Sequence, residues 1–210
     1  MIDENVNINI FNDWALQNKD QGMEKGHAKS VSEMLKIVNE YIGSLDHNFK
    51  FLDLGCGNGW VVKMFSNNNL CDLSVGVDGS ENMIKKAKLK DSKGIYYQSN
   101  IEEWNFKKKF DIIFSMETFY YFNNINNVLN NINSKLLTNG GLLIIGIDHY
   151  KENKPSLSWE NEIGIQTQTL SIKQWVNKLK ESNFQNVQFK QVGKKSPWMG
   201  TLILYANKNR

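Results

Sequence analysis

Hydrophobic residues in this chain alternate between two periods. Short apolar runs indicate buried strands, and stripes with a spacing of three and four residues indicate helices between them. The predicted strands are residues 49–54, 72–78, 94–100, 110–116, 140–148, 187–192 and 200–206. The predicted helical stripes begin near Val31, Gly59, Ser80, Ile125 and Ser171. This alternation predicts an α/β fold with a doubly wound, mostly parallel sheet and a C-terminal antiparallel hairpin.

The first thirty residues follow neither period. They are polar and irregular, so we expect a cap or lid at 1–30 rather than a further part of the sheet. Residues 1–210 are short enough for one domain. Its ligand-binding core is predicted at 48–148, and a substrate-side insertion is predicted at 149–170.

Composition and charge exclude several classes of protein. The net charge of +3 is small, and the basic runs at 85–90 and 107–109 are short, which favours solvated surface over a nucleic-acid partner. The two cysteines form no CxxC or His/Cys cluster, so we expect no metal site and a reduced, cytoplasmic protein. The longest apolar run, 142–147, is too short to cross a membrane, and the N-terminal sequence is not typical of a secretory signal.

The clearest chemical signal is the stretch FLDLGCGNGW (51–60). Gly55, Gly57 and Gly59 follow a predicted strand and lead into a helix, so the backbone can approach a ligand closely there. The N-terminus of that helix also offers unpaired N–H groups. The dinucleotide fingerprint G-x-G-x-x-G requires glycine where this chain has Trp60, so the pattern departs from it.

Three residues downstream of the glycine loop, Asp78, Asn100 and Ile101, suggest that the ligand is a nucleoside. Asp78 ends the second predicted strand, where a carboxylate can accept hydrogen bonds from both hydroxyls of a ribose. Asn100 ends the third strand and can bond the amine of an adenine, and Ile101 can cover its ring. These positions predict a nucleoside ligand at the carboxyl ends of the strands.

Five segments in this order and spacing resemble the class I S-adenosylmethionine-dependent methyltransferases. They are FLDLGCGNGW, GVDGSENMIKKA, SNIEEW, FDIIFSMETFYYF and LLTNGGLLIIG. The resemblance is close over 48–148 and looser over the two terminal strands. It implies a Rossmann-like, seven-stranded sheet with S-adenosyl-L-methionine as methyl donor and S-adenosyl-L-homocysteine as product. It also implies an enzyme of the small-molecule type.

The resemblance implies roles in cofactor binding for individual residues. The glycine loop would line the methionine and ribose parts, Asp53 would orient the amino group, and the Ser115 carbonyl would accept from it. Many relatives have aspartate where this chain has Asn100. The residues expected to bind the cofactor are Asp53, Gly55, Cys56, Gly57, Gly59, Asp78, Gly79, Ser80, Met83, Asn100, Ile101 and Ser115.

The acceptor of the methyl group should lie at the ends of the fourth and fifth strands. A sulfonium methyl is already activated, so catalysis depends largely on positioning. Carboxylates and aromatic rings at one mouth would suit a cationic or amine acceptor. The expected catalytic residues are Glu117, Tyr120 and His27, and the expected acceptor-binding residues are Trp14, Tyr121, Asp148 and Trp159. For His27, a role as a capping or surface residue carries equal weight.

Two other classes of function stay open at this point. One is a non-catalytic module that binds S-adenosylmethionine and regulates a partner. The other is a nicotinamide-dependent oxidoreductase, against which Trp60 and the terminal hairpin count. Within the methyltransferases, a protein or RNA acceptor is the alternative to a small molecule.

Overall fold

The computed structural model describes residues 2 and 4–209. Within this range the central sheet has seven strands in the order β3-β2-β1-β4-β5-β7-β6. The strands are β1 (Phe49–Leu54), β2 (Cys71–Asp78), β3 (Ile95–Gln98), β4 (Phe110–Met116), β5 (Leu137–Ile147), β6 (Phe184–Val192) and β7 (Thr201–Lys208). Strands β1 to β5 are parallel, and β7 runs antiparallel to β5 and β6. The predicted sheet and its C-terminal hairpin are confirmed.

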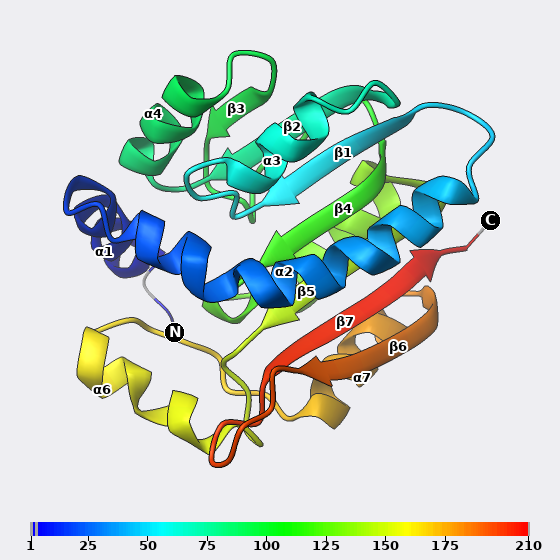
Figure 1. Cartoon of the computed structure of the whole chain (residues 1–210). Helices are drawn as coiled ribbons and strands as arrows, with labels where there is room; N and C mark the ends of the chain where they lie inside the picture. Colours follow the sequence, from blue (N-terminus) through cyan, green and yellow to red (C-terminus); the bar gives the residue numbers. More distant parts are fainter. Residues whose placement is uncertain (1, 3, 210) are drawn as a thin grey trace.

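Helices cover both faces of this sheet. Figure 1 shows α2 and α3 in front of it, with α5 and α7 behind. The helices are α1 (Glu4–Leu16), α2 (Asp20–Gly43), α3 (Trp60–Ser66), α4 (Glu81–Lys90), α5 (Ile125–Asn131), α6 (Trp159–Ile163) and α7 (Ile172–Glu181). Three shorter helical turns are η1 (Phe119–Tyr121), η2 (Ile132–Leu136) and η3 (Lys154–Ser158). Among the described residues, none of the helices combines the length and hydrophobicity that a membrane span needs.

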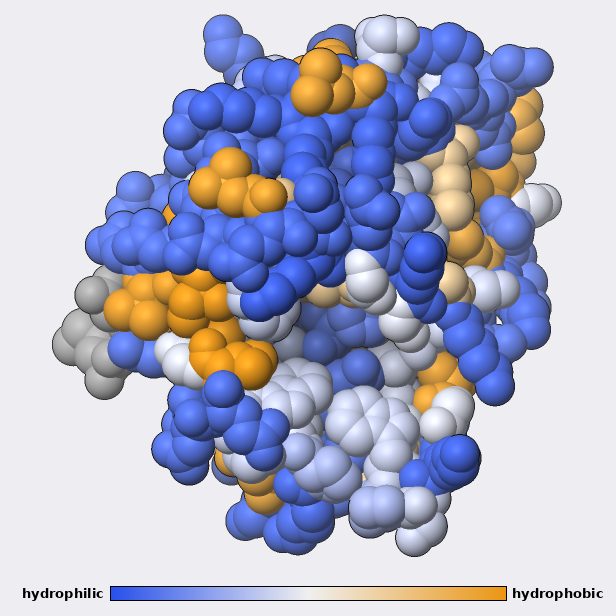
Figure 2. All heavy atoms as spheres, turned by 60° about the vertical axis from the view of Figure 1, so that its left-hand side comes forward, coloured by the Kyte–Doolittle hydropathy of each residue, from blue (hydrophilic) through white to orange (hydrophobic). Residues whose placement is uncertain are grey.

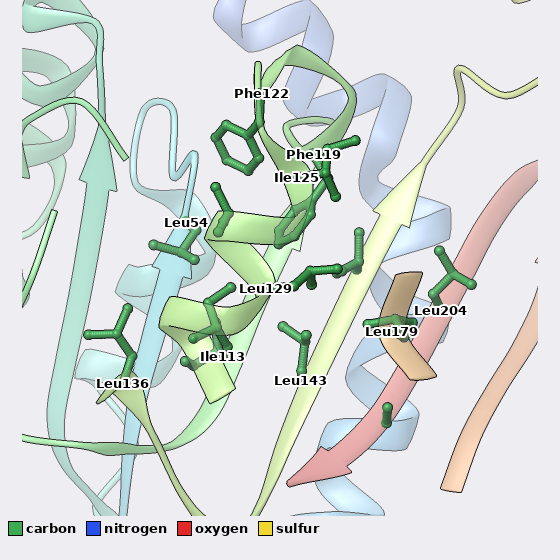
Figure 3. Packing of buried hydrophobic residues seen from close by; sticks show 14 of the residues in the cluster. Leu54, Ile113, Phe119, Phe122, Ile125, Leu129, Leu136, Leu143, Leu179 and Leu204 are labelled. Carbon is green, nitrogen blue, oxygen red and sulfur yellow. The ribbon is translucent and has the colours of Figure 1, made fainter. Parts of the chain in front are cut away.

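The strands bury both of their faces, which explains their continuous apolar sequences. Because successive side chains of a strand point to opposite faces, Phe51 packs under α2 and α3 while Leu52 packs on the α5 side. Figure 3 shows Ile113 and Leu143, from neighbouring strands, close to Leu129 of α5. Burial of each such side chain contributes about 2 kcal/mol of hydrophobic stabilisation. The sheet is therefore a rigid platform for the loops at its carboxyl edge.

Side-chain caps fix the starts of two helices where the sequence predicts them. The Ser80 hydroxyl accepts a hydrogen bond from the Met83 N–H at 3.2 Å and begins α4. At α7, Ser171 and Gln174 form a reciprocal capping box. Each cap satisfies backbone donors that the first turn of a helix leaves unpaired. The Ser80 cap also sets the direction in which the chain leaves β2, next to the site described below.

In the described part of residues 1–30, the segment expected to be a cap or lid is helical and contributes no strand to the sheet. Helix α1 and the first turns of α2 occupy residues that the sequence pattern left without structure. Their stability comes from distant partners: Ala15 is fully buried, and Asp20 and Glu24 pair with Lys86 and Lys90 of α4. Local periodicity does not reveal such polar partners. His27 consequently lies inside α2 rather than ahead of the first helix.

Candidate active site

A cleft opens at the carboxyl ends of β1, β2 and β4, beneath α1 and the N-terminal half of α2. In Figure 1 the arrowheads of these strands point toward α1, and Figure 2 shows a hollow on this side of the molecule with hydrophilic residues at depth. The cleft holds about 1090 Å³ of space, part of it open to solvent. This is the position where open α/β sheets bind their ligands.

Glycine is required for different structural reasons at the three positions of the loop after β1. All three have a positive φ, at 78°, 51° and 77° for Gly55, Gly57 and Gly59. A Cβ on Gly55 would lie 1.9 Å from the Thr118 hydroxyl, whereas a Cβ on Gly57 would meet nothing within 4 Å. A Cβ on Gly59 would lie 2.7 Å from the Ala87 Cβ. Of these three glycines, only Gly57 both lines the cleft and has open space where a side chain would begin.

Asp78 ties this loop to the end of β2. Its Oδ2 accepts a hydrogen bond from the Gly57 N–H at 2.8 Å, and its Oδ1 accepts one from the Ser80 N–H at 2.8 Å. Burial raises the pKa of this carboxyl, and the two backbone bonds oppose that effect. Each oxygen keeps a further lone pair for a ligand. The carboxylate can thus accept from two neighbouring hydroxyls while it holds the loop in place.

The other end of the cleft suits a flat, apolar ring. Met83 of α4 and Ile101, after β3, line it together with Ile8 of α1. Asn100 lies beside them, and its Oδ1 accepts from the Glu102 N–H at 2.9 Å. The cleft therefore joins a carboxylate for hydroxyl groups, an amide beside apolar side chains and a glycine loop without side chains. These features fit the ribose, adenine and methionine parts of S-adenosylmethionine.

Asp53, in the floor of the cleft, gives a testable pH dependence. Burial raises the pKa of its carboxyl well above the ordinary value, and the nearby Asp78 raises it further. The folded protein then holds this proton to higher pH than the unfolded chain. The stability that Asp53 contributes is fully present below about pH 4 and is lost as pH rises toward the folded-state pKa.

Asp53→Asn is therefore expected to raise the free energy of unfolding of the cofactor-free protein at pH 8 and to flatten its decline between pH 5 and 8. Asparagine is nearly isosteric and carries no proton that titrates in this range. Urea denaturation at several pH values measures this, with the exposed Asp72→Asn on β2 as control. A variant that is less stable than wild type at pH 8 would show that the Asp53 charge is stabilising.

Polar contacts hold α1 and α2 over the cleft. The Lys86 ammonium of α4 lies 2.5 Å from Asp20 Oδ1, and the Asn58 amide donates to Asp20 Oδ2 at 2.9 Å. Burial raises the pKa of Asp20, but these partners outweigh it and hold the pKa below its ordinary value. Asn12 of α1 accepts from the Ser80 hydroxyl at 2.7 Å. An ion pair and hydrogen bonds thus join the cover to α4 and the glycine loop.

Loss of the Lys86 contact should loosen this cover. We expect Lys86→Ala to raise the dissociation rate of S-adenosylhomocysteine by about 10-fold, because truncation of one partner of a largely buried ion pair acts mainly on dissociation. Stopped-flow displacement measures the rate. Lys85→Ala is the matched control, since Lys85 pairs with Glu81 on the exposed side of the same helix. Equal rates in both variants would contradict a closing role for the pair.

A second group of polar side chains gathers where β4 and β5 end. Glu117 has a positive φ of 57°, and its Oε1 accepts from the Asp148 N–H at 2.5 Å. Its Oε2 accepts from the Tyr120 hydroxyl at 2.6 Å. His27 Nε2, from α2, lies 3.8 Å from Asp148 Oδ2. One ring nitrogen of His27 and one carboxylate oxygen each of Glu117 and Asp148 all lie within 4.8 Å of one another.

Burial dominates the electrostatics of this group. It raises the pKa of Glu117 well above the ordinary value, and the Asp148 charge adds to the shift. It also raises the pKa of Asp148 and lowers the pKa of His27, although the Asp148 charge opposes the latter change. In addition, Asp148 Oδ1 is buried with no hydrogen-bond partner among the described residues. The group thus contains one buried acceptor, Asp148 Oδ1, without a partner among the described residues, and two Glu117 oxygens that each hold one hydrogen bond.

Most of the residues singled out in the sequence come together in the cleft. Those in its lining are His27, Asp53, Gly55, Cys56, Gly57, Asp78, Gly79, Met83, Asn100, Ile101, Glu117 and Tyr121. Tyr120 and Asp148 lie directly behind this lining, in contact with Glu117. The cleft therefore contains residues from both the expected cofactor end and the expected acceptor end.

Other expected site residues lie outside the lining. Gly59 packs against α4 and β3, and Ser80 caps α4. The Ser115 hydroxyl donates to the Leu54 carbonyl at 2.6 Å, inside the sheet. Trp14 packs edge-on against Phe11 with 5.5 Å between ring centres. Trp159 stacks with Trp198 at 6.2 Å, so this aromatic pair belongs to the packing of α6 rather than to the cleft wall.

The cleft lining also includes residues that the sequence interpretation missed. From α1 and α2 these are Asn7, Ile8, Phe11, Asp20, Met23 and Glu24, and from the glycine loop and α3 they are Asn58, Trp60 and Val61. Phe114, Met116, Thr118 and Phe122 add to it around the end of β4. Proximity to the glycine loop could have indicated Asn58 and Trp60. For α1, the sequence indicates only Trp14.

Comparisons with known proteins place this cleft in a wider context. A family model described as "Methyltransferase domain" matches residues 52–145. The malonyl-(acyl-carrier protein) O-methyltransferase of Bacillus cereus is 26% identical over 148 residues, which cover 67% of this chain and 55% of that protein. The chain spans about half the length of the curated relatives it matches.

Solved structures share the fold at lower identity. A methyltransferase from Haloferax volcanii, solved in complex with the Trm112 methyltransferase activator, superposes with a TM-score of 0.80 at 19% identity and covers 95% of this chain and 98% of its own. The magnesium protoporphyrin IX methyltransferase of Synechocystis, solved with bound S-adenosylhomocysteine, has a TM-score of 0.67 at 17% identity, with 88% and 84% covered.

Proposed function

We propose that this chain, which belongs to the class I S-adenosylmethionine-dependent methyltransferase family, transfers a methyl group from S-adenosylmethionine to a small-molecule acceptor. The observation that carries the proposal is the bond of Asp78 to the Gly57 N–H, which places a carboxylate and an open glycine face side by side. The relatives matched over this region are O-methyltransferases, which supports methyl transfer as the reaction.

Different residues of the cleft would bind different parts of the cofactor. Asp78 would accept from the ribose hydroxyls, Asn100 and Ile101 would hold the adenine, and Gly57 would leave room for the methionine part. Asp53 would hold the amino group. When bound, S-adenosylmethionine supplies an activated methyl group on a sulfonium sulfur. The protein must then position the acceptor and keep water out, which can provide much of the rate.

The acceptor end favours a cationic or amine acceptor. Glu117 lines the cleft there, and the Asp148 carboxylate lies just behind it. Phe11 and Tyr121 add aromatic faces, with 5.3 Å between their ring centres. Carboxylates attract a positive charge, and aromatic rings stabilise one that has lost water. Among the described residues, the same end holds no thiol, because Cys56 lies in the glycine loop and Cys71 at the start of β2.

Calorimetric titration of the purified protein tests this function. We expect micromolar binding of S-adenosylmethionine and S-adenosylhomocysteine and no binding of NAD. Binding of NAD alone would overturn the proposal in favour of an oxidoreductase. Methyl transfer from labelled cofactor to a panel of amines, thiols and carboxylic acids then separates an enzyme from a silent binding module, for which no acceptor in any class would be methylated.

A further inference from the structure

Three side chains from separate elements meet at the acceptor end of the cleft. His27 comes from α2, Glu117 from the turn after β4 and Asp148 from the end of β5. Since one nitrogen or oxygen atom of each lies within 4.8 Å of the others, a point exists within about 2.8 Å of all three atoms. That distance is a normal hydrogen-bond length from an N–H group.

All three side chains offer acceptors at this point. Each Glu117 oxygen already takes one hydrogen bond and keeps a second lone pair. Asp148 is 7% exposed, and its buried Oδ1 has no partner among the described residues. Burial lowers the pKa of His27, so its ring stays neutral near pH 7 and one of its nitrogens accepts. A ligand that fills this place must therefore bring donors.

The charges of the cleft indicate the sign of that ligand. The described residues that line it include Asp20, Glu24, Asp53, Asp78 and Glu117, but no Lys or Arg. The Lys86 and Lys90 ammonium groups compensate Asp20 and Glu24 from outside the lining. Nothing comparable among the described residues faces Glu117 and Asp148 apart from His27. Burial without a nearby cation raises the pKa of both carboxyls, so a cation placed between them would favour their charged forms and be favoured in turn.

We propose that His27, Glu117 and Asp148 form a subsite for the N–H groups of a primary or secondary ammonium, and that the acceptor of this enzyme is an amine methylated on nitrogen. The bound ammonium would pass one N–H proton to one of these three acceptors. Its nitrogen lone pair would then form the N–C bond as the methyl group leaves the sulfonium sulfur, with S-adenosylhomocysteine as the other product. This inference rests on the proposed function and narrows its acceptor class. A quaternary ammonium has the charge but no N–H donor, and an alcohol has a donor but no charge. Neither satisfies the three acceptors together.

Binding of matched probes to the cofactor-free protein tests the subsite without turnover. The probes are 2-phenylethylammonium, its trimethylated quaternary analogue and 2-phenylethanol, whose common ring suits the aromatic side chains Phe11, Tyr121 and Phe122 of the cleft. We expect the primary ammonium to bind at least about 10-fold more tightly than either analogue, since hydrogen bonds between charged partners are the strong ones. Calorimetry gives the affinities.

Variants locate the binding. Glu117→Gln and Asp148→Asn keep the shape of the side chain and remove its charge, and His27→Phe keeps a flat ring without a nitrogen acceptor. Each variant should bind the primary ammonium about 10-fold or more weakly than wild type. Glu40→Gln, an exposed change on the same helix α2, should leave its affinity unchanged. In NMR spectra of the histidine rings, the signals of His27 should move on titration while those of the exposed His47 stay.

Several outcomes would overturn the subsite. Equal affinity for the quaternary probe would mean that charge alone is recognised, and absence of binding by all three would mean that no such subsite exists. Micromolar binding of Mn²⁺ that Glu117→Gln and Asp148→Asn abolish, without ammonium binding, would assign the three residues to a metal instead. S-adenosylhomocysteine binding is measured separately. If the protein does not bind S-adenosylhomocysteine, the proposed function is overturned. If it does bind and one of the three outcomes above is found, only the ammonium subsite is overturned.

Discussion

Asp78→Ala is expected to weaken the binding of S-adenosylmethionine by at least about 100-fold, because two charge-assisted hydrogen bonds to the ribose hydroxyls contribute about 1.5–3 kcal/mol each. The same change frees the Gly57 N–H, which Asp78 Oδ2 holds at 2.8 Å. The glycine loop would then lose the contact that fixes its shape beside the cofactor. Both effects act on binding in the same direction.

Calorimetry with S-adenosylhomocysteine measures this loss. Asp78→Asn keeps one acceptor oxygen, so its affinity for S-adenosylhomocysteine should lie between those of Asp78→Ala and wild type. Asp72→Ala, an exposed carboxylate on the same strand β2, should bind normally. If Asp78→Ala stayed within threefold of wild type while folded, the ribose would have to bind elsewhere in the cleft, and the assignment of the cofactor would fail.

The parts of this structure that the sequence predicts are those with local causes. Strand β1 coincides with the predicted 49–54, since its apolar run is buried on both faces and ends at a glycine with positive φ. Ser80 and Ser171 begin their helices as the capping patterns indicate. Most residues expected to bind the cofactor lie within a few positions of the strand ends, so the predicted strands bring them together at one edge of the sheet.

The parts that the sequence does not predict depend on distant partners. The apolar residues of helix α1 are interrupted by asparagines, and the helix is held by contacts such as that of Asn7 with the Gln166 carbonyl at 2.9 Å. Likewise, nothing near His27 in the sequence indicates that its ring meets Asp148. The acceptor-binding role expected of Trp159 rests on its aromatic character alone, and in the structure its ring stacks on Trp198. Residue type alone cannot decide between packing and binding.

Two glycines of one loop should respond to the same substitution in opposite ways. Gly57→Ala places a methyl group in the open space of the cleft, with only the cost of a left-handed alanine, about 1–2 kcal/mol, to the free energy of unfolding. Its methyl would occupy the place assigned to the methionine part. We therefore expect S-adenosylhomocysteine affinity to fall by about 100-fold or more, with a protein that is still folded.

Gly59→Ala carries the same backbone cost and adds a collision. Its Cβ would lie 2.7 Å from the Ala87 Cβ and 2.8 Å from the Tyr96 ring, which are part of a tightly packed layer between α3, α4 and β3. Overpacking of this kind costs about 1–3 kcal/mol, so the total loss of stability should reach about 3 kcal/mol. Because the methyl group points away from the cleft, cofactor affinity should change little at temperatures where the variant is folded.

Urea denaturation and calorimetry on both variants separate the two roles. The family resemblance assigns Gly57 and Gly59 alike to the cofactor, whereas the structure places Gly59 behind the loop. If Gly59→Ala kept its stability and lost its cofactor, the loop would have to present its third glycine to the ligand, and the packing described for α3 would be wrong. The opposite pattern would mean that glycine recurs here for two reasons, close approach to a ligand at Gly57 and close approach of two helices at Gly59.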